Sequence, residues 1–463
     1  MASIGVFTIA SKNYLAYVRT MLNSVARVHP EYKLYLCLAD QVDDYFEADQ
    51  EPYTVIQADQ LGIHNFTDMT LRYDIMEFNT AVKPFMFRWL FDNTDLDTVI
   101  YLDPDTRAYS RFDRLESVLE SGASVVLTPH ITKPLEDGKN PNDYHMLQAG
   151  VFNLGFIAAR RCSETLDFMD WWGRRLSAQC IADHSASLFV DQKWCDLAPC
   201  FLDNLNVFKD PCYNVAYWNL AQRQVTESFN GEWQVNGSSL AFFHFSGINV
   251  DKRHIVSKHQ NRFGWDDIQG CQSLFEHYLD ELVAYGWNMT RNWPYAYSSV
   301  SGKLGLSVLL RRLYRLSVPQ PISLVGIDVS EYLVDLCNQA DEKYSGKGGV
   351  QITRLMSLVY QLRPDVQAAF GLSTPEGRRQ FIAWFEVAGE REYGLPHSLT
   401  HSALSQGSSI SSDGSKKSAA WCYRILIVAE EPARKLSKYL PVASRRKAKS
   451  LWLRIKDNVL RAF

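Results

Sequence analysis

The sequence lacks the signatures of several well-defined protein classes. Its nine cysteines are scattered over 463 residues, with no C-x-x-C pair and no Cys/His cluster at zinc-like spacing. Neither a disulfide framework nor a structural zinc site is therefore predicted. No G-x-G-x-x-G motif follows the first strand-like run, and no G-x-S-x-G motif occurs. These absences argue against dinucleotide binding and against nucleophilic hydrolase chemistry.

Targeting and membrane-spanning patterns are also missing. Residues 1–10 carry no basic n-region and no long apolar stretch, and no later segment approaches the length needed to span a bilayer. We therefore expect a cytoplasmic protein whose thiols stay reduced.

Charge is distributed unevenly, although the formal net charge is only -4. From Lys416 to the C-terminus there are thirteen Lys and Arg against three Asp and Glu, which leaves this tail near +10 and the preceding chain near -14. Because the positive charge is confined to one end, it favours an interaction tail over general nucleic-acid binding. No nucleic-acid partner is expected.

Short apolar runs alternate with helical patterns over the first 160 residues. This alternation predicts an α/β fold with a mostly parallel sheet covered by helices. Ligands bind such sheets at the carboxyl ends of the strands, so the loops after Ala10 and Leu102 are expected to carry the chemistry. The predicted strands cover residues 4–10, 34–39, 54–58, 98–103, 124–129 and 150–158.

The length exceeds what one hydrophobic core usually serves, which predicts more than one unit. We expect a principal domain over residues 1–265 and a mostly helical accessory module over residues 266–400, the C-terminal helical region. Residues 401–463 read as a Ser/Gly-rich linker followed by a basic, amphipathic tail. Such a tail can contact the anionic inner leaflet of a membrane peripherally, or it can pack as a helix on the acidic body of the protein.

The strongest local pattern is the apolar run Val99–Leu102 followed by Asp103-Pro104-Asp105. A strand that stops at two carboxylates one residue apart delivers both to the ligand edge of a sheet. Pro104 restricts the backbone between them and favours an extended Asp103. Two carboxylates held this way suit a hard divalent cation such as Mn²⁺ or Mg²⁺, with positions left for phosphate oxygens.

Further motifs follow in a fixed order along the chain. They are Thr8-Ile-Ala-Ser-Lys-Asn13-Tyr14, Asp103-Pro-Asp105, Phe152-Asn153-Leu-Gly155, Asp191-Gln192 and Phe243-His244-Phe-Ser-Gly247. In this order they resemble the retaining glycosyltransferases of family eight and related bacterial polysaccharide glycosyltransferases. The resemblance covers about residues 4–250. It implies a Rossmann-like fold of the GT-A type and a nucleotide-sugar-binding catalytic domain within residues 1–265.

The resemblance also implies roles for individual residues. His244 is expected to complete the metal shell begun by Asp103 and Asp105, and Asp191, Gln192 and Asn153 to face the reacting sugar. A metal ion so placed can stabilise the negative charge of a departing diphosphate. Contacts with the nucleotide and its phosphates are expected from Ala10, Asn13, Tyr14, Lys83, Arg88, Asp103, Gly155, Gly247 and Lys252.

Lys252 is expected to take the place of a family lysine six residues beyond the histidine, because Val250 occupies that position here. For Lys83 and Arg88, the alternative interpretation is a solvated charge on a helix. The implied donor is a nucleotide sugar, with a UDP-sugar expected, and the implied acceptor is a glycan or lipid-linked sugar.

The resemblance implies retention of anomeric configuration, although Asp191 could also act as a general base in an inverting reaction. A second likeness, Leu362-Arg-Pro-Asp365 with Glu392-Tyr-Gly-Leu-Pro396, suggests surface-polysaccharide synthesis. Two other interpretations stay open: a sugar nucleotidyltransferase, which normally shows a Gly-rich basic loop after the first strand, and a non-catalytic nucleotide-sugar-binding protein.

Overall fold

A computed structural model describes residues 3–344 and 350–401 of the chain. Within the described residues, the contacts divide into two compact units, one formed by residues 3–311 and 318–326 and the other by residues 312–317, 327–344 and 350–401. The predicted linker and basic tail over residues 401–463 lie outside the described residues, apart from His401. Among the described residues, no helix has the length and apolar character needed to cross a membrane.

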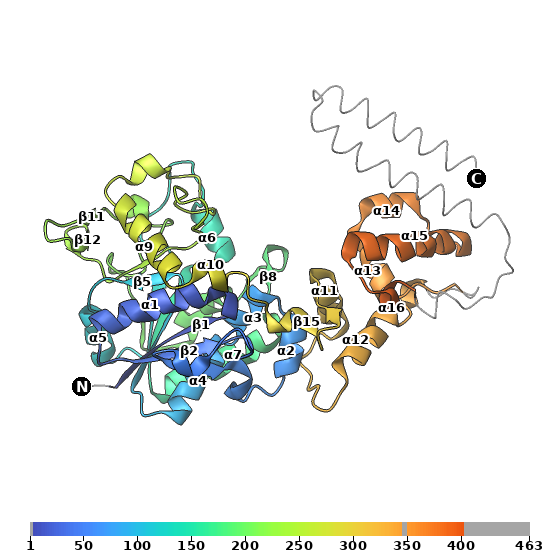
Figure 1. The fold of residues 1–463 in the computed structure, drawn as a ribbon, viewed down its shortest axis with the longest axis horizontal. Helices are drawn as coiled ribbons and strands as arrows, with labels where there is room; N and C mark the ends of the chain where they lie inside the picture. Colours follow the sequence, from blue (N-terminus) through green and yellow to red (C-terminus); the bar gives the residue numbers. More distant parts are fainter. Residues whose placement is uncertain (1–2, 345–349, 402–463) are drawn as a thin grey trace, which may run out of the picture. The chain divides into compact units, whose positions relative to one another are not determined.

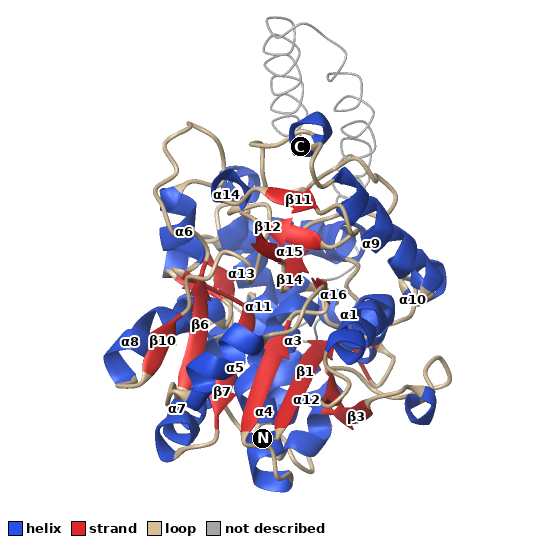
Figure 2. Cartoon of the chain, turned by 90° about the vertical axis from the view of Figure 1, so that its left-hand side faces the viewer, coloured by secondary structure: helices blue, strands red, loops and turns tan. Residues whose placement is uncertain are grey.

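A seven-stranded sheet organises the first unit, in the order β10-β6-β7-β4-β1-β2-β3 (Figure 2). Every neighbouring pair is parallel except the two pairs made by β7, which runs antiparallel to β4 and β6. The strands are β1 (Ile4–Ala10), β2 (Lys33–Leu38), β3 (Thr54–Gln57), β4 (Thr98–Leu102), β6 (Val125–Pro129), β7 (Phe152–Arg160) and β10 (Leu205–Val207). The predicted α/β fold with a mostly parallel sheet is confirmed.

Helices cover both faces of this sheet (Figure 1). Successive strand residues point to opposite faces, so Val6 and Ile100 join one core while Phe7 and Tyr101 join the other. Burial on both faces explains why these strands read as continuous apolar runs rather than as alternating ones. The first core contains α1 (Leu15–Val28), α5 (Asp113–Glu120), α9 (Gln272–Ala284) and α10 (Trp287–Thr290); the second contains α2 (Phe66–Arg72), α3 (Ile75–Ala81), α4 (Lys83–Asn93) and α7 (Ser163–Gln179).

Smaller elements complete the first unit. A two-stranded ribbon pairs β5 (Thr106–Ala108) with β14 (Phe242–His244), and a separate small sheet contains β11 (Val225–Glu227), β12 (Trp233–Val235) and β13 (Ser238–Ser239). The remaining short elements are α6 (Asp143–Ala149), β8 (Ala182–Asp183), β9 (Leu188–Phe189), α8 (Ala198–Phe201), β15 (Ser299–Val300) and β16 (Leu304–Gly305). Residues 180–201, which connect α7 to β10, thus form the short strands β8 and β9, 3-10 turns and α8.

Residues 266–311 belong to the first compact unit, because α9 and α10 pack their apolar faces against α1. The units thus divide well beyond residue 265, within α11 (Val308–Ser317) and the segment that follows it. The described part of the second unit is helical, as predicted for the C-terminal region. It comprises α12 (Val329–Asn338), α13 (Arg354–Leu362), α14 (Pro364–Ala369), α15 (Pro375–Tyr393) and α16 (His397–Thr400).

Candidate active site

Asp103 and Asp105 lie where β4 ends, at the carboxyl edge of the sheet. The backbone N–H of Asp103 donates to Gly155 O at 2.8 Å, and the Tyr101 hydroxyl donates to Asp103 Oδ1 at 2.5 Å. These two bonds fix both the chain and the side chain of Asp103. The first of them depends on β7 running antiparallel, since that direction brings the beginning of β7 to the edge where β4 ends.

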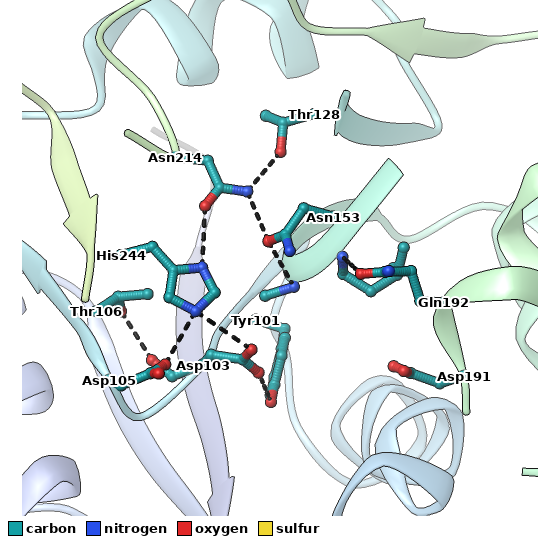
Figure 3. A network of polar contacts seen from close by, with 12 residues as sticks. Tyr101, Asp103, Asp105, Thr106, Thr128, Asn153, Asp191, Gln192, Asn214 and His244 are labelled. Atoms are coloured by element: carbon teal, nitrogen blue, oxygen red, sulfur yellow. Dashed lines mark hydrogen bonds and ion pairs between the residues drawn. The ribbon is translucent and has the colours of Figure 1, made fainter. Parts of the chain in front are cut away.

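His244 reaches the two aspartates through the β5–β14 ribbon, in which it pairs with Thr106. Its Nε2 lies 3.0 Å from Asp105 Oδ1 and 3.7 Å from Asp103 Oδ2 (Figure 3). One ligand atom from each of the three residues lies within 4.8 Å of the others. Two carboxylates and an imidazole at this separation could hold a divalent cation.

The tautomer of His244 follows from a chain of hydrogen bonds that begins at an unambiguous donor. The backbone N–H of Gly155 donates to Asn153 Oδ1 at 3.2 Å, so that atom is the amide oxygen. Asn214 must then turn its nitrogen to Asn153, at 3.0 Å, and its oxygen to His244 Nδ1, at 3.2 Å. His244 Nδ1 therefore carries the hydrogen, and the lone pair of neutral His244 is on Nε2, facing both aspartates. No motif in the sequence had indicated a role for Asn214.

The charged groups of this cluster shift one another's pKa values. Burial raises the pKa of Asp103, and the Lys83 ammonium and His244 act in the opposite direction. Burial acts to lower the pKa of His244, but Asp105 and Asp103 outweigh it and the net shift is upward. Each group therefore depends on the charge of its neighbours, as expected for a site that collects a cation.

Gly155 permits the close approach of these side chains. A Cβ atom at this position would lie 2.3 Å from His244 Cε1 and 2.8 Å from Asp103 Oδ2, which real side chains do not tolerate. The glycine of the Asn153-Leu-Gly155 motif thus leaves room for the two predicted metal ligands.

Ala10 is the buried last residue of β1, and Asn13 and Tyr14 lie in the turn that follows it, at the same edge of the sheet. Lys12 holds this turn against the residues after β2, because its buried ammonium lies 3.2 Å from Asp40 Oδ1 and donates to Gln41 O at 3.0 Å. The Tyr14 ring is 45% exposed and stacks on Tyr17 at 4.7 Å. Burial raises the pKa of Tyr14, and the negative charges of Asp105 and Asp103 add to the rise.

Lys83 and Asp191 form an ion pair buried beside the cluster. Lys83 Nζ lies 2.5 Å from Asp191 Oδ2 and donates to Leu154 O at 2.8 Å, and both side chains are almost fully buried. Burial raises the pKa of Asp191, and Lys83 opposes that rise. Lys83 is therefore not a solvated helix charge. Its partner in the structure is the carboxylate that the resemblance assigned to the reacting centre.

Gln192 and Asn153 hold the start of β7. Gln192 Oε1 accepts from Leu154 N at 3.1 Å, and Gln192 Nε2 donates to Ala149 O at 2.9 Å. Asn153 is also held through its oxygen, as described above. In Figure 3, Gln192 lies on the same side of the site as Asp191, and Asn153 lies between Asn214 and Gln192.

Three predicted residues are not brought into the cluster by any described contact. Arg88 points away on α4, where it forms ion pairs of 3.2 Å with Asp92 and with Asp170. Lys252 is exposed, with its backbone N–H bonded to Asn249. Gly247 adopts a left-handed backbone conformation, with φ +76. It lies two residues beyond Phe245, and it is the Phe245 N–H, not Gly247, that donates to Asp105 O, at 2.8 Å.

Two residues that the sequence did not single out, Tyr217 and His259, lie within electrostatic range of Asp105. Burial raises the pKa of Tyr217 to about 12, and Asp105 adds to the rise. Burial lowers the pKa of His259, Lys258 adds to that effect, and Asp105 opposes both. The two rings lie 6.2 Å apart. Neither residue belongs to a recognisable sequence motif. Only the fold, which brings the chain on both sides of β14 to the site, indicates that they belong to it.

No family model matches the chain. A curated protein of Bacillus subtilis (strain 168), named "Uncharacterized protein YfnF", is 28% identical over 186 residues. The match covers 38% of this chain and 58% of that protein, so the chain spans less than two thirds of its curated relative.

Solved structures with a similar backbone include one described as the galactosyltransferase LgtC in complex with donor and acceptor sugar analogs. It is 13% identical with a TM-score of 0.38, and the match covers 60% of this chain and 95% of that one. The glycosyltransferase GlyE of Streptococcus pneumoniae TIGR4 gives 14% identity and a TM-score of 0.36, with 64% and 66% covered. The bifunctional WbbM gives 12% identity and a TM-score of 0.37, with 62% and 51% covered.

Proposed function

We propose that this protein is a metal-dependent glycosyltransferase of the GT-A type that moves a sugar from a nucleotide diphosphate sugar to a glycan or lipid-linked acceptor. The observation that carries the proposal is the convergence of Asp103, Asp105 and His244 at the carboxyl edge of the sheet. When bound there, a Mn²⁺ or Mg²⁺ ion would stabilise the negative charge that a nucleoside diphosphate acquires as it leaves.

The residues after β1 fit a nucleotide beside that ion. Tyr14 offers a partly exposed aromatic face for a base or ribose. Asn13 Oδ1 is buried and has no hydrogen-bond partner among the described residues. A buried acceptor without a donor costs about 1–3 kcal/mol, and an N–H of a nucleotide base would remove that cost. A UDP-sugar is the donor proposed for this site.

The opposite side of the cluster fits the sugar. Within the described residues, the Gln192 amide makes two hydrogen bonds, and an amide can make four. Its remaining capacity, together with Asn153, suits the hydroxyl groups of a sugar without adding charge. Asp191 supplies a carboxylate whose charge Lys83 balances. By resemblance of the motifs, the proposed reaction retains anomeric configuration and serves surface-polysaccharide synthesis.

The test uses the full chain with a panel of nucleotide sugars, in Mn²⁺ or in EDTA. The correct donor should raise the unfolding free energy by about 2.7 kcal/mol at one hundred times its dissociation constant. Transfer to acceptor should require the metal. Asp105→Asn should lower the rate at least about 100-fold, which corresponds to about 3 kcal/mol of transition-state stabilisation.

Asp266→Asn is the matched control, because Asp266 is exposed and lies outside the cluster. Its rate should equal that of the wild type. Undiminished transfer by Asp105→Asn would refute the metal-dependent mechanism. Tight, metal-dependent binding of a donor without any release of nucleotide would instead identify a non-catalytic binding protein.

A further inference from the structure

Two histidines and a glutamate meet in the second unit, far along the sequence from the candidate active site. His397 and His401 are separated by four residues at α16, and their rings stack 3.8 Å apart. Both turn Nδ1 to the same atom, Glu390 Oε1 of α15, at 3.3 Å and 3.9 Å. One ligand atom from each of the three residues lies within 4.8 Å of the others.

The turn between α15 and α16 builds this arrangement. Gly394 ends α15 with φ +63, and the buried side chains of Leu395 and Leu399 hold the chain that follows. A Cβ at Gly389 would lie 2.7 Å from Thr400 Cγ2, so this glycine allows α16 to pack closely on α15. Glycine inside a helix costs about 1 kcal/mol relative to alanine. The close packing of α16 on α15 explains why glycine occupies position 389 despite this cost.

A second carboxylate stands on the same face of α15. Glu386 precedes Glu390 by four residues, the spacing that places side chains one above the other on a helix. Burial raises the pKa of Glu386, and His401 and His397 oppose the rise, which places this carboxylate within electrostatic range of both rings.

Another His/Glu cluster shows what a purely structural arrangement looks like. In the cluster of His29, Glu31 and Glu116, His29 Nε2 accepts from the backbone N–H of Phe112 at 2.8 Å. His29 Nδ1 then carries the hydrogen and donates to Glu31 Oε1 at 3.1 Å. Both nitrogens of that ring are used in the protein, and His29 is not available to a metal ion.

The α15–α16 cluster differs because two stacked imidazoles compete for one carboxylate oxygen. The Thr400 hydroxyl adds a third contact, since it lies 3.3 Å from that same oxygen and 2.9 Å from His401 Nδ1. If both rings were protonated, their charges would repel at this distance. A divalent ion accepts lone pairs from two imidazoles and a carboxylate at once, and the hydroxyl then orients the carboxylate from outside.

We propose that Glu390, His397 and His401 bind a divalent transition-metal ion, with Zn²⁺ as the expected ion. Imidazole nitrogen with carboxylate oxygen is a zinc-type ligand set, and two histidines set this site apart from the predicted Mn²⁺ or Mg²⁺ site. The ion would clamp α16 onto α15. The sequence analysis predicted no zinc site, but His397 and His401 are four positions apart, which is a zinc-like spacing, and the helix turn brings Glu390 to them. The inference does not depend on the proposed glycosyltransferase function.

The experiment measures bound zinc on the full chain produced without a histidine tag. After treatment with EDTA and reloading with Zn²⁺, metal content per chain is measured following gel filtration. Co²⁺ titration then reports ligand geometry through its d–d absorption. Three variants are compared with the wild type: the pair His397→Ala and His401→Ala, the pair Asp103→Asn and Asp105→Asn, and His277→Ala. His277 is an exposed histidine on α9 outside any described ligand cluster, which makes it the control.

One zinc site should persist in the aspartate pair and in His277→Ala, and it should disappear in the histidine pair. Glu390→Gln, which alters an exposed side chain and should leave the fold unchanged, should weaken zinc binding at least about tenfold. The proposal is overturned if the wild type retains no zinc, or if zinc is lost only with the aspartates. Unchanged zinc affinity in Glu390→Gln overturns it as well, even if the histidine pair fails to fold.

Discussion

Gly155→Ala should damage the candidate active site while leaving every predicted ligand in place. The added Cβ would lie 2.3 Å from His244 Cε1, whereas non-bonded carbon atoms rest about 3.5–4.0 Å apart. The imidazole or the β7 backbone must therefore move by about 1 Å. Overpacking of this kind costs about 1–3 kcal/mol of folding stability.

A shift of that size also matters to a metal ion, because coordination distances vary by only about 0.2 Å in well-formed sites. We expect the affinity for Mn²⁺ to fall at least about tenfold and thermal unfolding to occur at a lower temperature. Mn²⁺ affinity can be measured by electron paramagnetic resonance of the free ion, and stability by calorimetry in EDTA.

Gly305→Ala is the matched control for this substitution. Gly305 lies in β16, and a Cβ there has no heavy atom within 4 Å. The control should keep both the stability and the metal affinity of the wild type. If Gly155→Ala behaves like Gly305→Ala in both assays, the close packing of Gly155 against His244 and Asp103 is refuted.

Two further predictions concern ion pairs in the first unit. Lys83→Met should leave the buried Asp191 carboxylate without its counter-ion and lower the unfolding free energy by about 3–5 kcal/mol. The double variant with Asp191→Asn should recover part of the lost stability, and urea titrations measure both effects. Arg262 hydrogen bonds lower the pKa of Asp137 to about 2, below its usual value of about 3.9. The stability from this pair is therefore present above about pH 4 and is lost as pH falls through 2. Asp137→Asn should flatten that part of the curve of unfolding free energy against pH; an unchanged slope would contradict the assignment.

Much of the sheet follows from local sequence, because a strand buried on both faces has a composition of its own. Val99–Leu102 is apolar throughout, Ile4–Ala10 is interrupted only by Thr8, and both are strands within a residue of their predicted bounds. Asp103 and Asp105 follow from the same logic, since parallel strands present their carboxyl ends at one edge. The sequence alone thus predicted the α/β fold and the position of the two acids within it.

The direction of β7 depended on pairing that no local pattern encodes. A strand with both neighbours antiparallel has the same apolar composition as a parallel one, so the sequence predicted only a strand over residues 150–158, and the structure places it at Phe152–Arg160. Its reversal brings Gly155 O to Asp103 N and thereby sets the spacing of the site. The placement of His244 likewise depends on the pairing of β14 with β5.

Whether a charged residue is solvated or paired in the interior depends on its burial, which only the fold determines. Lys83 and Asp191 could each be proposed from motifs, but only the fold shows them buried together, where a charge without a partner would cost several kcal/mol. Glu390, His397 and His401 are close because Gly389 and Gly394 allow one turn to fold back. The sequence therefore determined which residues enter strands and which stand at strand ends. The tertiary structure alone decided which distant side chains form ion pairs and hydrogen bonds or lie close enough to bind one metal ion. These interactions need short distances between residues that are far apart in the sequence, and only folding produces those distances.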